Sequence, residues 1–418
     1  MNEFSFVFLA ALLLSVVVKL WLAQRQMQHV AANRERVPAA FADRIPLEDH
    51  RKAADYTLAN VRLGRIETVY GALLLVGWTL GGWLQWLDDA VRALGWDSIP
   101  TGVAVILAAF LIMTLLDVPV SLYHTFVVEE RFGFNRTTAL TFVGDLIKQA
   151  LLIVLLGGPL AWAALWLMQG SGDYWWLWLW LLWSAFSLVM MWAYPTFIAP
   201  LFNRFQPLDD ESLRQRIQAL LEKCGFHSQG IYVMDGSRRS GHGNAYFTGL
   251  GRNKRIVFFD TLLKSLDADE IEAVLAHELG HFKRRHVQKR IVTTLLMSLA
   301  GLALLGWLVD QPWFYQGLGV STPSNHMALL LFMLVIPVFT FFLQPLMSWF
   351  SRRHEFEADA FAARQASADD LVRALVKLYK ENASTLTPDP LYSAFYDSHP
   401  PASLRIAHLS RQLQGQAT

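Results

Sequence analysis

Residues 328–350, ALLLFMLVIPVFTFFLQPLMSWF, form a predominantly apolar run that is followed closely by Arg352 and Arg353. A helix needs about 20 apolar residues to cross a bilayer, so this run is long enough to span a membrane. Six more runs reach or approach that length: 4–22, 69–87, 102–123, 146–168, 174–194 and 291–309. Together they predict a predominantly α-helical, polytopic membrane protein with seven transmembrane helices.

The first of these runs, 4–22, also lies where a secretory signal peptide would lie. It lacks a basic segment before the apolar stretch and an obvious small-residue cleavage site. Signal peptides carry both features, so we interpret the run as a retained span.

The composition supports a membrane protein. Charged residues make up 17% of the 418 residues, whereas an ordinary soluble domain carries roughly a quarter, and 54% are hydrophobic. This abundance of apolar side chains excludes a disordered chain. The net charge of +1 provides no basic field for a nucleic acid, and we expect no such partner. Cys224 is the one cysteine, which excludes an intramolecular disulfide and a C-x-x-C metal site.

Basic residues are concentrated in alternate connecting segments. Many lie between the first two spans and Arg131 and Arg136 lie between the third and fourth, whereas Arg92 stands alone between the second and third. Because cytoplasmic loops carry the excess of Lys and Arg, we expect the N-terminus outside and the catalytic regions on the cytoplasmic side, at the inner membrane if the protein is bacterial. The expected segments are spans one to five, a polar insertion, spans six and seven, and a C-terminal catalytic region: 1–194, 195–290, 291–350 and 351–418.

The polar insertion has the features of a small α+β domain. Three of its segments are typical of strands, since they are rich in β-branched or aromatic residues or lie between turn residues: 231–234, 244–248 and 255–259. A helix follows, because Asp267 and Glu270 have the spacing of a capping box and precede apolar residues at helical intervals. The C-terminal region predicts two more helical segments: 351–366 and 371–379.

The helix of the insertion carries His277-Glu278-Leu279-Gly280-His281. Residues four apart share a helical face, so both imidazoles can reach one Zn²⁺ with Glu278 beside the open coordination position. Zinc lowers the pKa of bound water to about 7, and a neighbouring carboxylate can accept its proton. The pattern therefore predicts a hydrolytic zinc site with Glu278 as general base. Taken alone, it also fits an exposed helix with two unrelated histidines.

A catalytic zinc needs a third protein ligand, and Glu355, Glu357 and Asp359 lie just beyond the last span. The last two spans form a hairpin that returns the chain to the membrane surface from which the HExxH helix entered. Glu355 and Asp359 are four residues apart and share a face, whereas Glu357 points elsewhere. We expect one carboxylate to bind zinc and the other to orient a zinc-bound histidine. The alternative is a solvated acidic helix face.

These motifs resemble those of the type I CAAX prenyl endopeptidases, which are integral-membrane zinc proteases with HExxH on one helix and ExxxD on another. Here the second motif is Glu355-Phe356-Glu357-Ala358-Asp359. Further similar stretches run from about residue 120 to the C-terminus: FVVEERFGFN (126–135), IAPLFN (198–203), HGNAYF (242–247), RIVFFDTLL (255–263) and SHPP (398–401), with Arg405.

The resemblance implies one Zn²⁺ per chain, held by His277, His281 and Glu355, with Asp359 orienting a zinc-bound imidazole. The expected mechanism has Glu278 deprotonating the attacking water and then protonating the leaving amine.

It also implies that Asn244 binds the substrate backbone, that His399 stabilises the oxyanion and that Arg405 takes part in the same site as a substrate-binding residue. The family fold further implies seven helices around a water-containing chamber, which Asp117 and Glu67 can line. Without the resemblance, His399 is a loop residue and Arg405 a cation on a helix face. We assign the neighbouring His242, His286 and His354 to the surface or to positions beside the ligands.

The expected activity is that of a zinc metalloendopeptidase, with a peptide or protein substrate, prenylated or unprenylated, and membrane lipid as partners. Family members remove the three residues after a prenylated C-terminal cysteine, but nothing in the sequence itself recognises a prenyl group. A broader quality-control protease of the membrane is therefore a first alternative. A transporter with a regulatory zinc is a second, because polar residues within the spans are compatible with a transport pathway.

Overall fold

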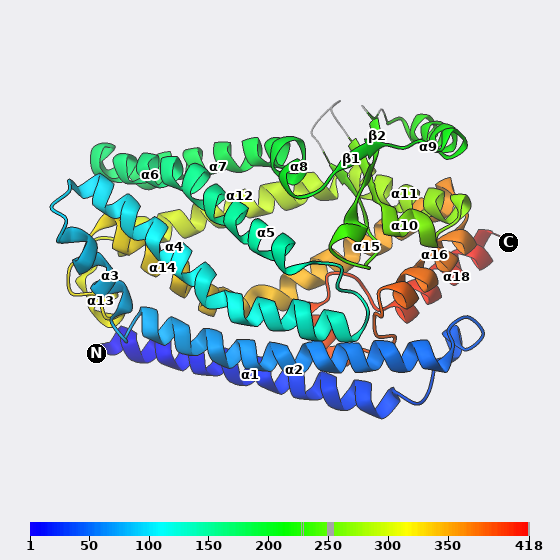
Figure 1. The fold of residues 1–418 in the computed structure, drawn as a ribbon, viewed down its shortest axis with the longest axis horizontal. Helices are drawn as coiled ribbons and strands as arrows, with labels where there is room; N and C mark the ends of the chain where they lie inside the picture. Colours follow the sequence, from blue (N-terminus) through cyan, green and yellow to red (C-terminus); the bar gives the residue numbers. More distant parts are fainter. Residues whose placement is uncertain (227, 229, 249–254, 417–418) are drawn as a thin grey trace.

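The structure is a computed structural model, which describes residues 1–226, 228, 230–248 and 255–416. Long helical segments dominate it (Figure 1): α1 (Glu3–Asn33), α2 (Leu47–Trp78), α4 (Ser98–Tyr123) continued by η2 (His124–Glu129), α5 (Ala139–Leu152) continued by η3 (Ile153–Gly157) and α6 (Gly158–Gly170), α7 (Trp175–Ala193) continued by η5 (Tyr194–Ile198) and α8 (Ala199–Phe202), α12 (His286–Leu308), and α14 (Asn325–Thr340) continued by η7 (Phe341–Leu343) and α15 (Gln344–Gln365). Shorter helices connect them: η1 (Ala39–Phe41), α3 (Trp83–Arg92), η4 (Gly172–Tyr174) and α13 (Pro312–Gly317).

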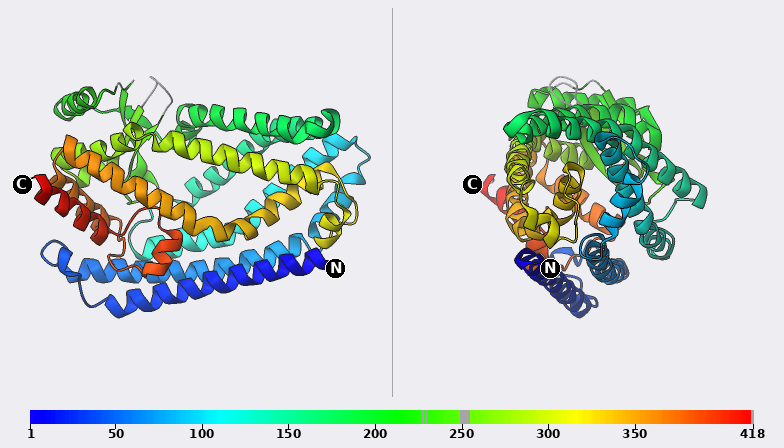
Figure 2. Two further views of the ribbon diagram at one scale, coloured as in Figure 1. Left: turned by 180° about the vertical axis from the view of Figure 1, so that it is seen from behind. Right: turned by 90° about the vertical axis from the view of Figure 1, so that its left-hand side faces the viewer.

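The long segments form the membrane part of the molecule. Within the described residues, six of them are long and apolar enough to cross a bilayer, beginning at Glu3, Ser98, Ala139, Gly172, His286 and Asn325. The other long helix, α2, is not among these six, since it is charged at its start and apolar only at its end. The end-on view in Figure 2 shows these helices arranged around the long axis, with the N- and C-termini at opposite ends of the molecule. The prediction of a predominantly α-helical, polytopic membrane protein is confirmed.

The expected second span, 69–87, is wrong in its bounds. Helix α2 ends at Trp78, the chain turns through residues 79–82, and the separate helix α3 begins at Trp83. Gly82, the residue before α3, has φ 76°, a left-handed conformation that helical residues do not adopt. The sequence remains apolar across this break. In the structure the Trp83 ring packs back on Trp78, with ring centroids 6.1 Å apart. Hydropathy alone cannot separate two helices whose apolar faces meet.

The polar insertion contains a four-stranded sheet in the order β1-β2-β4-β3: β1 (Phe205–Pro207), β2 (Gly230–Met234), β3 (Ala245–Thr248) and β4 (Arg255–Phe259). β2 and β4 are parallel, and the other pairs are antiparallel. The three predicted strands are confirmed to within one residue. β1 went unrecognised because it is three residues long and ends in a proline. Short elements complete the region: α9 (Glu211–Cys224), η6 (Gly236–Arg238) and α10 (Asp260–Ser265).

Helix α11 (Ala268–Lys283) carries the HExxH motif and begins at the predicted capping box. The Glu270 N–H donates to Asp267 Oδ1 at 3.0 Å, and the Asp267 N–H donates to Glu270 Oε2 at 2.9 Å. The C-terminal region adds α16 (Ala368–Glu381), α17 (Pro390–Tyr396) and α18 (Ala402–Gln416), so the helical segments predicted at 351–366 and 371–379 are confirmed within α15 and α16.

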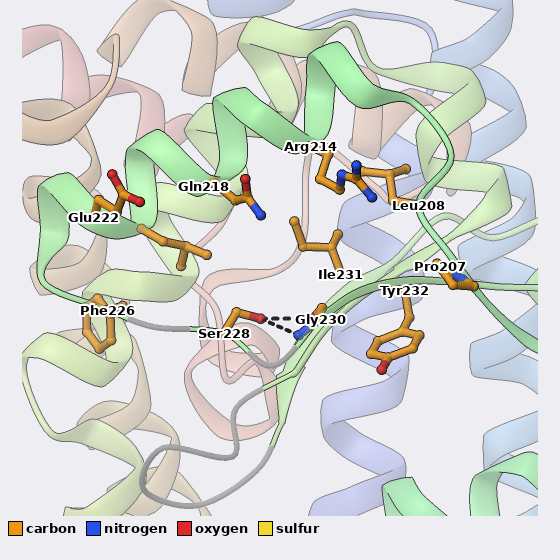
Figure 3. A pocket seen from close by; sticks show the side chains of 11 residues that line it. Pro207, Leu208, Arg214, Gln218, Glu222, Phe226, Ser228, Gly230, Ile231 and Tyr232 are labelled. Carbon is orange, nitrogen blue, oxygen red and sulfur yellow. Dashed lines mark hydrogen bonds between the residues drawn. The ribbon is translucent and has the colours of Figure 1, made fainter.

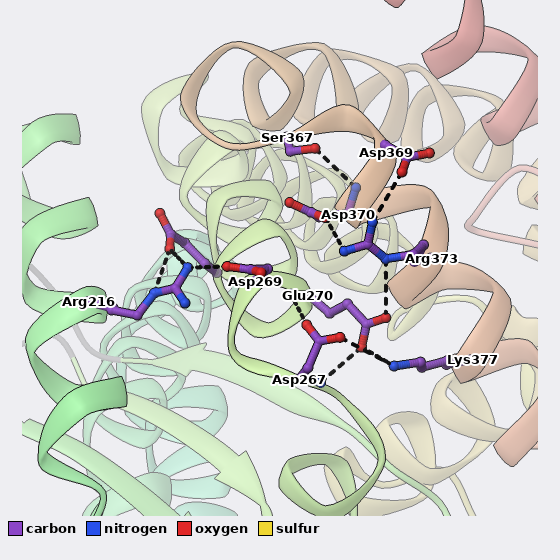
Figure 4. Close-up of polar contacts among 10 residues, drawn as sticks. Arg216, Asp267, Asp269, Glu270, Ser367, Asp369, Asp370, Arg373 and Lys377 are labelled. Atoms are coloured by element: carbon purple, nitrogen blue, oxygen red, sulfur yellow. Dashed lines mark hydrogen bonds and ion pairs between the residues drawn. The ribbon is translucent and has the colours of Figure 1, made fainter.

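Charged side chains tie α11 to its neighbours (Figure 4). The fully buried Glu270 carboxylate pairs with Lys377 Nζ of α16 at 2.6 Å, and Arg216 of α9 lies 2.8 Å from Glu272. Beneath these pairs, α9, the sheet, α11, α15 and α16 share one apolar core, in which Cys224 is buried as expected. The helix that carries the predicted metal ligands is therefore held on several sides.

Candidate metal centre

Helices α11 and α15 cross at the point where Gly280 faces Ala358. On α11, one face buries Leu275, Ala276 and Leu279 in the core, which leaves the histidines of the motif to face α15. The close crossing brings the ExxxD motif of α15 against them. Two motifs that are far apart in the sequence thus meet in one place.

The donor atoms of His277, His281 and Glu355 all lie within 4.8 Å of one another. The two Nε2 atoms of the histidines are 3.2 Å apart. Glu355 Oε2 lies 3.4 Å from His277 Nε2, and Glu355 Oε1 lies 3.3 Å from His281 Nε2. His277 and Glu355 are buried, and His281 is partly buried.

This donor set fits a metal ion. Glu355 Oε2 is buried and makes no hydrogen bond within the described residues, although histidine nitrogens lie close to it. A buried, unpaired carboxylate oxygen is costly unless a cation or a donor satisfies it. Two imidazole nitrogens and one carboxylate oxygen form the three-ligand set of catalytic zinc sites, which leave a fourth position open.

Asp359 and Arg405 lie behind His277. Asp359 Oδ1 is 2.8 Å from His277 Nδ1, the nitrogen that faces away from Glu355. Arg405 donates to both oxygens of Asp359, from Nε at 2.9 Å and from Nη2 at 2.5 Å. All three side chains are buried. The structure thus places Arg405, inside the protein, against the carboxylate that faces His277 Nδ1.

Neighbouring charges shift the pKa values of His277 and Arg405. Burial alone would lower the pKa of His277, but its hydrogen bonds to Asp359 and Glu355 outweigh that effect and raise the pKa to about 9. Burial likewise opposes the charge of Arg405, and the adjacent Asp359 raises its pKa above the ordinary value. The carboxylates therefore favour positive charge on the imidazole that faces them.

His399 contacts Glu355, and Glu278 directly follows His277 on α11. His399 Nδ1 lies 2.7 Å from Glu355 Oε2, while its side chain is 61% exposed. Glu278 lines a small cavity together with residues 245–247 of β3. Asn244 is exposed just before β3, and its Oδ1 accepts the N–H of Ala245 at 2.8 Å. The structure thus brings His399 to Glu355, and it places Asn244 directly before the strand whose residues 245–247 line the same cavity as Glu278.

His281 contacts a further histidine, His286, through its Nδ1 atom. His281 Nδ1 is 3.1 Å from His286 Nδ1, and His286 Nε2 is 3.0 Å from Glu357 Oε2. The buried His286 ring also stacks on His354, with centroids 4.0 Å apart. We assigned both histidines to the surface or beside the ligands, and the structure brings His286 to the second of these positions. Its contact with Glu357 crosses from α12 to α15, which sequence spacing does not reveal.

A larger cavity of about 580 Å³ lies elsewhere, between α9 and β2 (Figure 3). Arg214, Gln218 and Glu222 line it from α9, and Ile231 and Tyr232 line it from β2. It shares no lining residue with the three-ligand group, so cavity size alone would have pointed away from the site.

Two family descriptions match the chain. "CAAX prenyl protease N-terminal, five membrane helices" matches residues 26–204, and "Peptidase family M48" matches residues 207–413. The two matches together cover most of the described membrane helices and the whole of the candidate site.

Similar proteins are known in eukaryotes. CAAX prenyl protease 1 of Saccharomyces cerevisiae is 34% identical over 417 residues, covering 93% of this chain and 91% of that protein. A CAAX prenyl protease 1 homolog of Arabidopsis thaliana is 42% identical over 301 residues, covering 70% and 69%. The crystal structure of S. mikatae Ste24p superposes with a TM-score of 0.91 at 30% identity, covering 98% of this chain and 99% of the other.

Proposed function

The chain belongs to the M48 peptidase family, with CAAX prenyl protease 1 among its relatives, and we propose that it is a zinc endopeptidase for CAAX-type C-termini. Family membership makes it an integral-membrane metalloendopeptidase that acts on a peptide or protein. The proposal adds the metal, the residue roles and the substrate. The observation that carries it is the convergence of His277, His281 and Glu355 donor atoms within 4.8 Å.

One Zn²⁺ would be held by His277 Nε2, His281 Nε2 and a Glu355 oxygen. When bound, zinc supplies Lewis-acid polarisation of the scissile carbonyl and makes water more acidic. Glu278, one residue from His277 and beside β3, accepts the proton of the attacking water and delivers it to the leaving amine. The exposed His399 donates a hydrogen bond to the carbonyl oxygen as negative charge develops there.

Asp359 and Arg405 are positioning residues in this proposal. Asp359 accepts the His277 Nδ1–H and so leaves the Nε2 lone pair for the metal. Arg405 holds both Asp359 oxygens from inside the protein, a position that supports orientation of the acid in preference to direct substrate binding. Asn244 keeps its proposed role as a substrate-binding residue, because its exposed side chain stands at the start of β3.

The proposed substrate is a prenylated CAAX-type C-terminus. The supporting observation is the identity of 34% to a CAAX prenyl protease 1 over 93% of the chain. We place the N-terminus outside and the catalytic region in the cytoplasm, at the inner membrane if the protein is bacterial. The basic loops favour this orientation, and the two termini lie at opposite ends of the long axis. The prenyl chain would then enter a chamber between the helices from the lipid.

The test uses the purified protein in detergent with a farnesylated CAAX peptide and its unprenylated twin. We expect removal of the last three residues from the farnesylated peptide, abolished by a chelator and restored by zinc. Glu278→Gln should retain zinc and lose several orders of magnitude in kcat. Full activity of Glu278→Gln would remove the base from the proposal, and equal cleavage of both peptides would favour the broader quality-control protease.

A further inference from the structure

Asn382 pairs its side-chain amide with the backbone of Gly243 in both directions. The Gly243 N–H donates to Asn382 Oδ1 at 2.9 Å, and Asn382 Nδ2 donates to the Gly243 carbonyl oxygen at 3.2 Å. A residue of a neighbouring antiparallel strand exchanges the same two bonds with its partner. The Asn382 side chain therefore takes the place of one strand residue beside the segment that leads into β3.

The edge that Asn382 occupies is the outer edge of the sheet. β3 is last in the strand order and, among the described residues, pairs with β4 alone. The Phe259 N–H of β4 donates to the Asn244 carbonyl oxygen at 2.9 Å, so Asn244 turns its backbone toward β4. Because the hydrogen-bonding direction alternates along a strand, residues 243, 245 and 247 turn their backbone groups outward.

An extended peptide can add to such an edge as a further strand. β3 lies beside the motif helix, because residues 245–247 line a small cavity between the sheet and α11 together with Glu278. Asn382 is hydrogen-bonded to Gly243, the first residue whose backbone faces outward, and Asn244 Oδ1 accepts the N–H of Ala245. The next outward groups are the Ala245 carbonyl oxygen and the backbone of Phe247.

Asn382 is held on a fixed helix end. It directly follows α16, where its N–H donates to the Leu378 carbonyl oxygen at 3.0 Å. The next residue, Ala383, has φ 46° and is buried against Ala53 of α2 and Phe134. Lys380 Nζ also lies 3.1 Å from Asp49 of α2. The amide is thus positioned by the membrane helix α2 as well as by α16.

We infer that Asn382 is a positioning residue that sets the register of the peptide substrate along β3. The inference rests on the proposed peptidase function. Because Asn382 already pairs with Gly243, a peptide can pair only with the stretch from Ala245 to Phe247. The blocked position at Gly243 thereby fixes which peptide bond lies beside Glu278. Removal of the amide frees the Gly243 groups, and a peptide can then slide by two residues, since equivalent pairing positions repeat every second residue.

The experiment compares wild type, Asn382→Ala and Asn382→Asp, with Glu381→Ala as the matched control from the same helix end. A farnesylated CAAX peptide is digested and every product is identified by mass spectrometry. Wild type and Glu381→Ala should cut one bond. Asn382→Ala should also cut two residues away, and the share of product cut at the original bond should fall accordingly. Asn382→Asp should behave similarly, because its second oxygen faces the Gly243 carbonyl without a proton to donate.

A backbone N-methyl scan of the peptide provides a test on the wild-type enzyme that does not depend on the folding of a variant. Methylation of an amide that pairs with Ala245 or Phe247 should slow cleavage, whereas methylation at the position facing Gly243 should have no effect. Equal sensitivity at that third position, or a folded Asn382→Ala that cuts the original bond alone at the wild-type rate, overturns the inference. Cleavage of no peptide by the wild type overturns the proposed function and the inference with it.

Discussion

Gly280 of α11 lies so close to Ala358 of α15 that a Cβ atom on it would stand 2.9 Å from the Ala358 Cα and 3.1 Å from the Ala358 carbonyl oxygen. Both neighbours are backbone atoms, which cannot turn aside as a side-chain end can. The glycine therefore permits the helix crossing that brings Glu355 and Asp359 to His277. In a helix interior glycine is intrinsically unfavourable by about 1 kcal/mol relative to alanine, so this contact explains its place in the motif.

Gly280→Ala should weaken metal binding although alanine is the better helix former. The added methyl group forces α15 away from α11, with an overpacking cost of about 1–3 kcal/mol. We expect a lower thermal midpoint in detergent and less zinc retained after dialysis. Gly301→Ala in α12 is the matched control, because its Cβ would meet Phe332 at an ordinary 3.6 Å. A Gly280→Ala protein with wild-type zinc content would show that the two helices can separate without disturbing the ligands.

Glu355→Ala should lose most of its zinc. Removal of this carboxylate leaves two neutral imidazoles as the only ligands. The loss in zinc affinity should therefore exceed about 100-fold, the upper value typical when a residue that hydrogen-bonds to a ligand is removed. Metal analysis after chelator competition measures the effect. Glu222→Ala, which removes an exposed carboxylate on α9, should retain the wild-type stoichiometry. Unchanged zinc in Glu355→Ala would exclude this residue as a ligand.

Asp359→Asn should lower zinc affinity by about 10–100-fold while leaving the three ligands in place. The substitution removes the charge that faces His277 Nδ1 and leaves Arg405 with a weaker partner. Chelator competition gives the affinity, and the spectrum of the cobalt-substituted protein reports the ligand geometry. A neutral amide that bound zinc as tightly as the acid would mean that the charge of Asp359 does not act through His277.

Asp267→Ala should destabilise the start of α11 by about 1 kcal/mol through loss of the helix cap. The backbone N–H of Glu270, aided by Lys377, holds the pKa of Asp267 below its ordinary value. The native state therefore prefers the ionised form, so the stabilisation is complete above the unfolded-state pKa of about 4 and is lost as the pH falls through the lowered native value. Thermal midpoints of both proteins should differ at pH 7 and converge in acid. A difference independent of pH would contradict the assigned cap.

The capping box, three of the four strands and two of the C-terminal helices, α15 and α16, were predictable, because each follows from contacts within a few residues. The break between α2 and α3 was not, since the Trp83 ring continues the apolar pattern across it. Likewise, the pairing of Asp359 with Arg405 joins residues that no local period relates, and the resemblance placed Arg405 in the site without assigning it this contact. Asn382 gave no sequence signal at all, since an asparagine after a helix is an ordinary cap.

The sequence by itself determined the membrane class of the protein and the residue types of its candidate metal centre. Both follow from short stretches of sequence. The membrane class follows from apolar runs long enough for a bilayer, and the residue types follow from a motif whose two histidines share one helical face. Only the tertiary structure decided which acid faces which nitrogen, and that a side chain after α16 fills the edge leading into β3. These relationships depend on how closely and at what angle separate elements pack, which is set by the sum of many distant contacts and by no single stretch of chain.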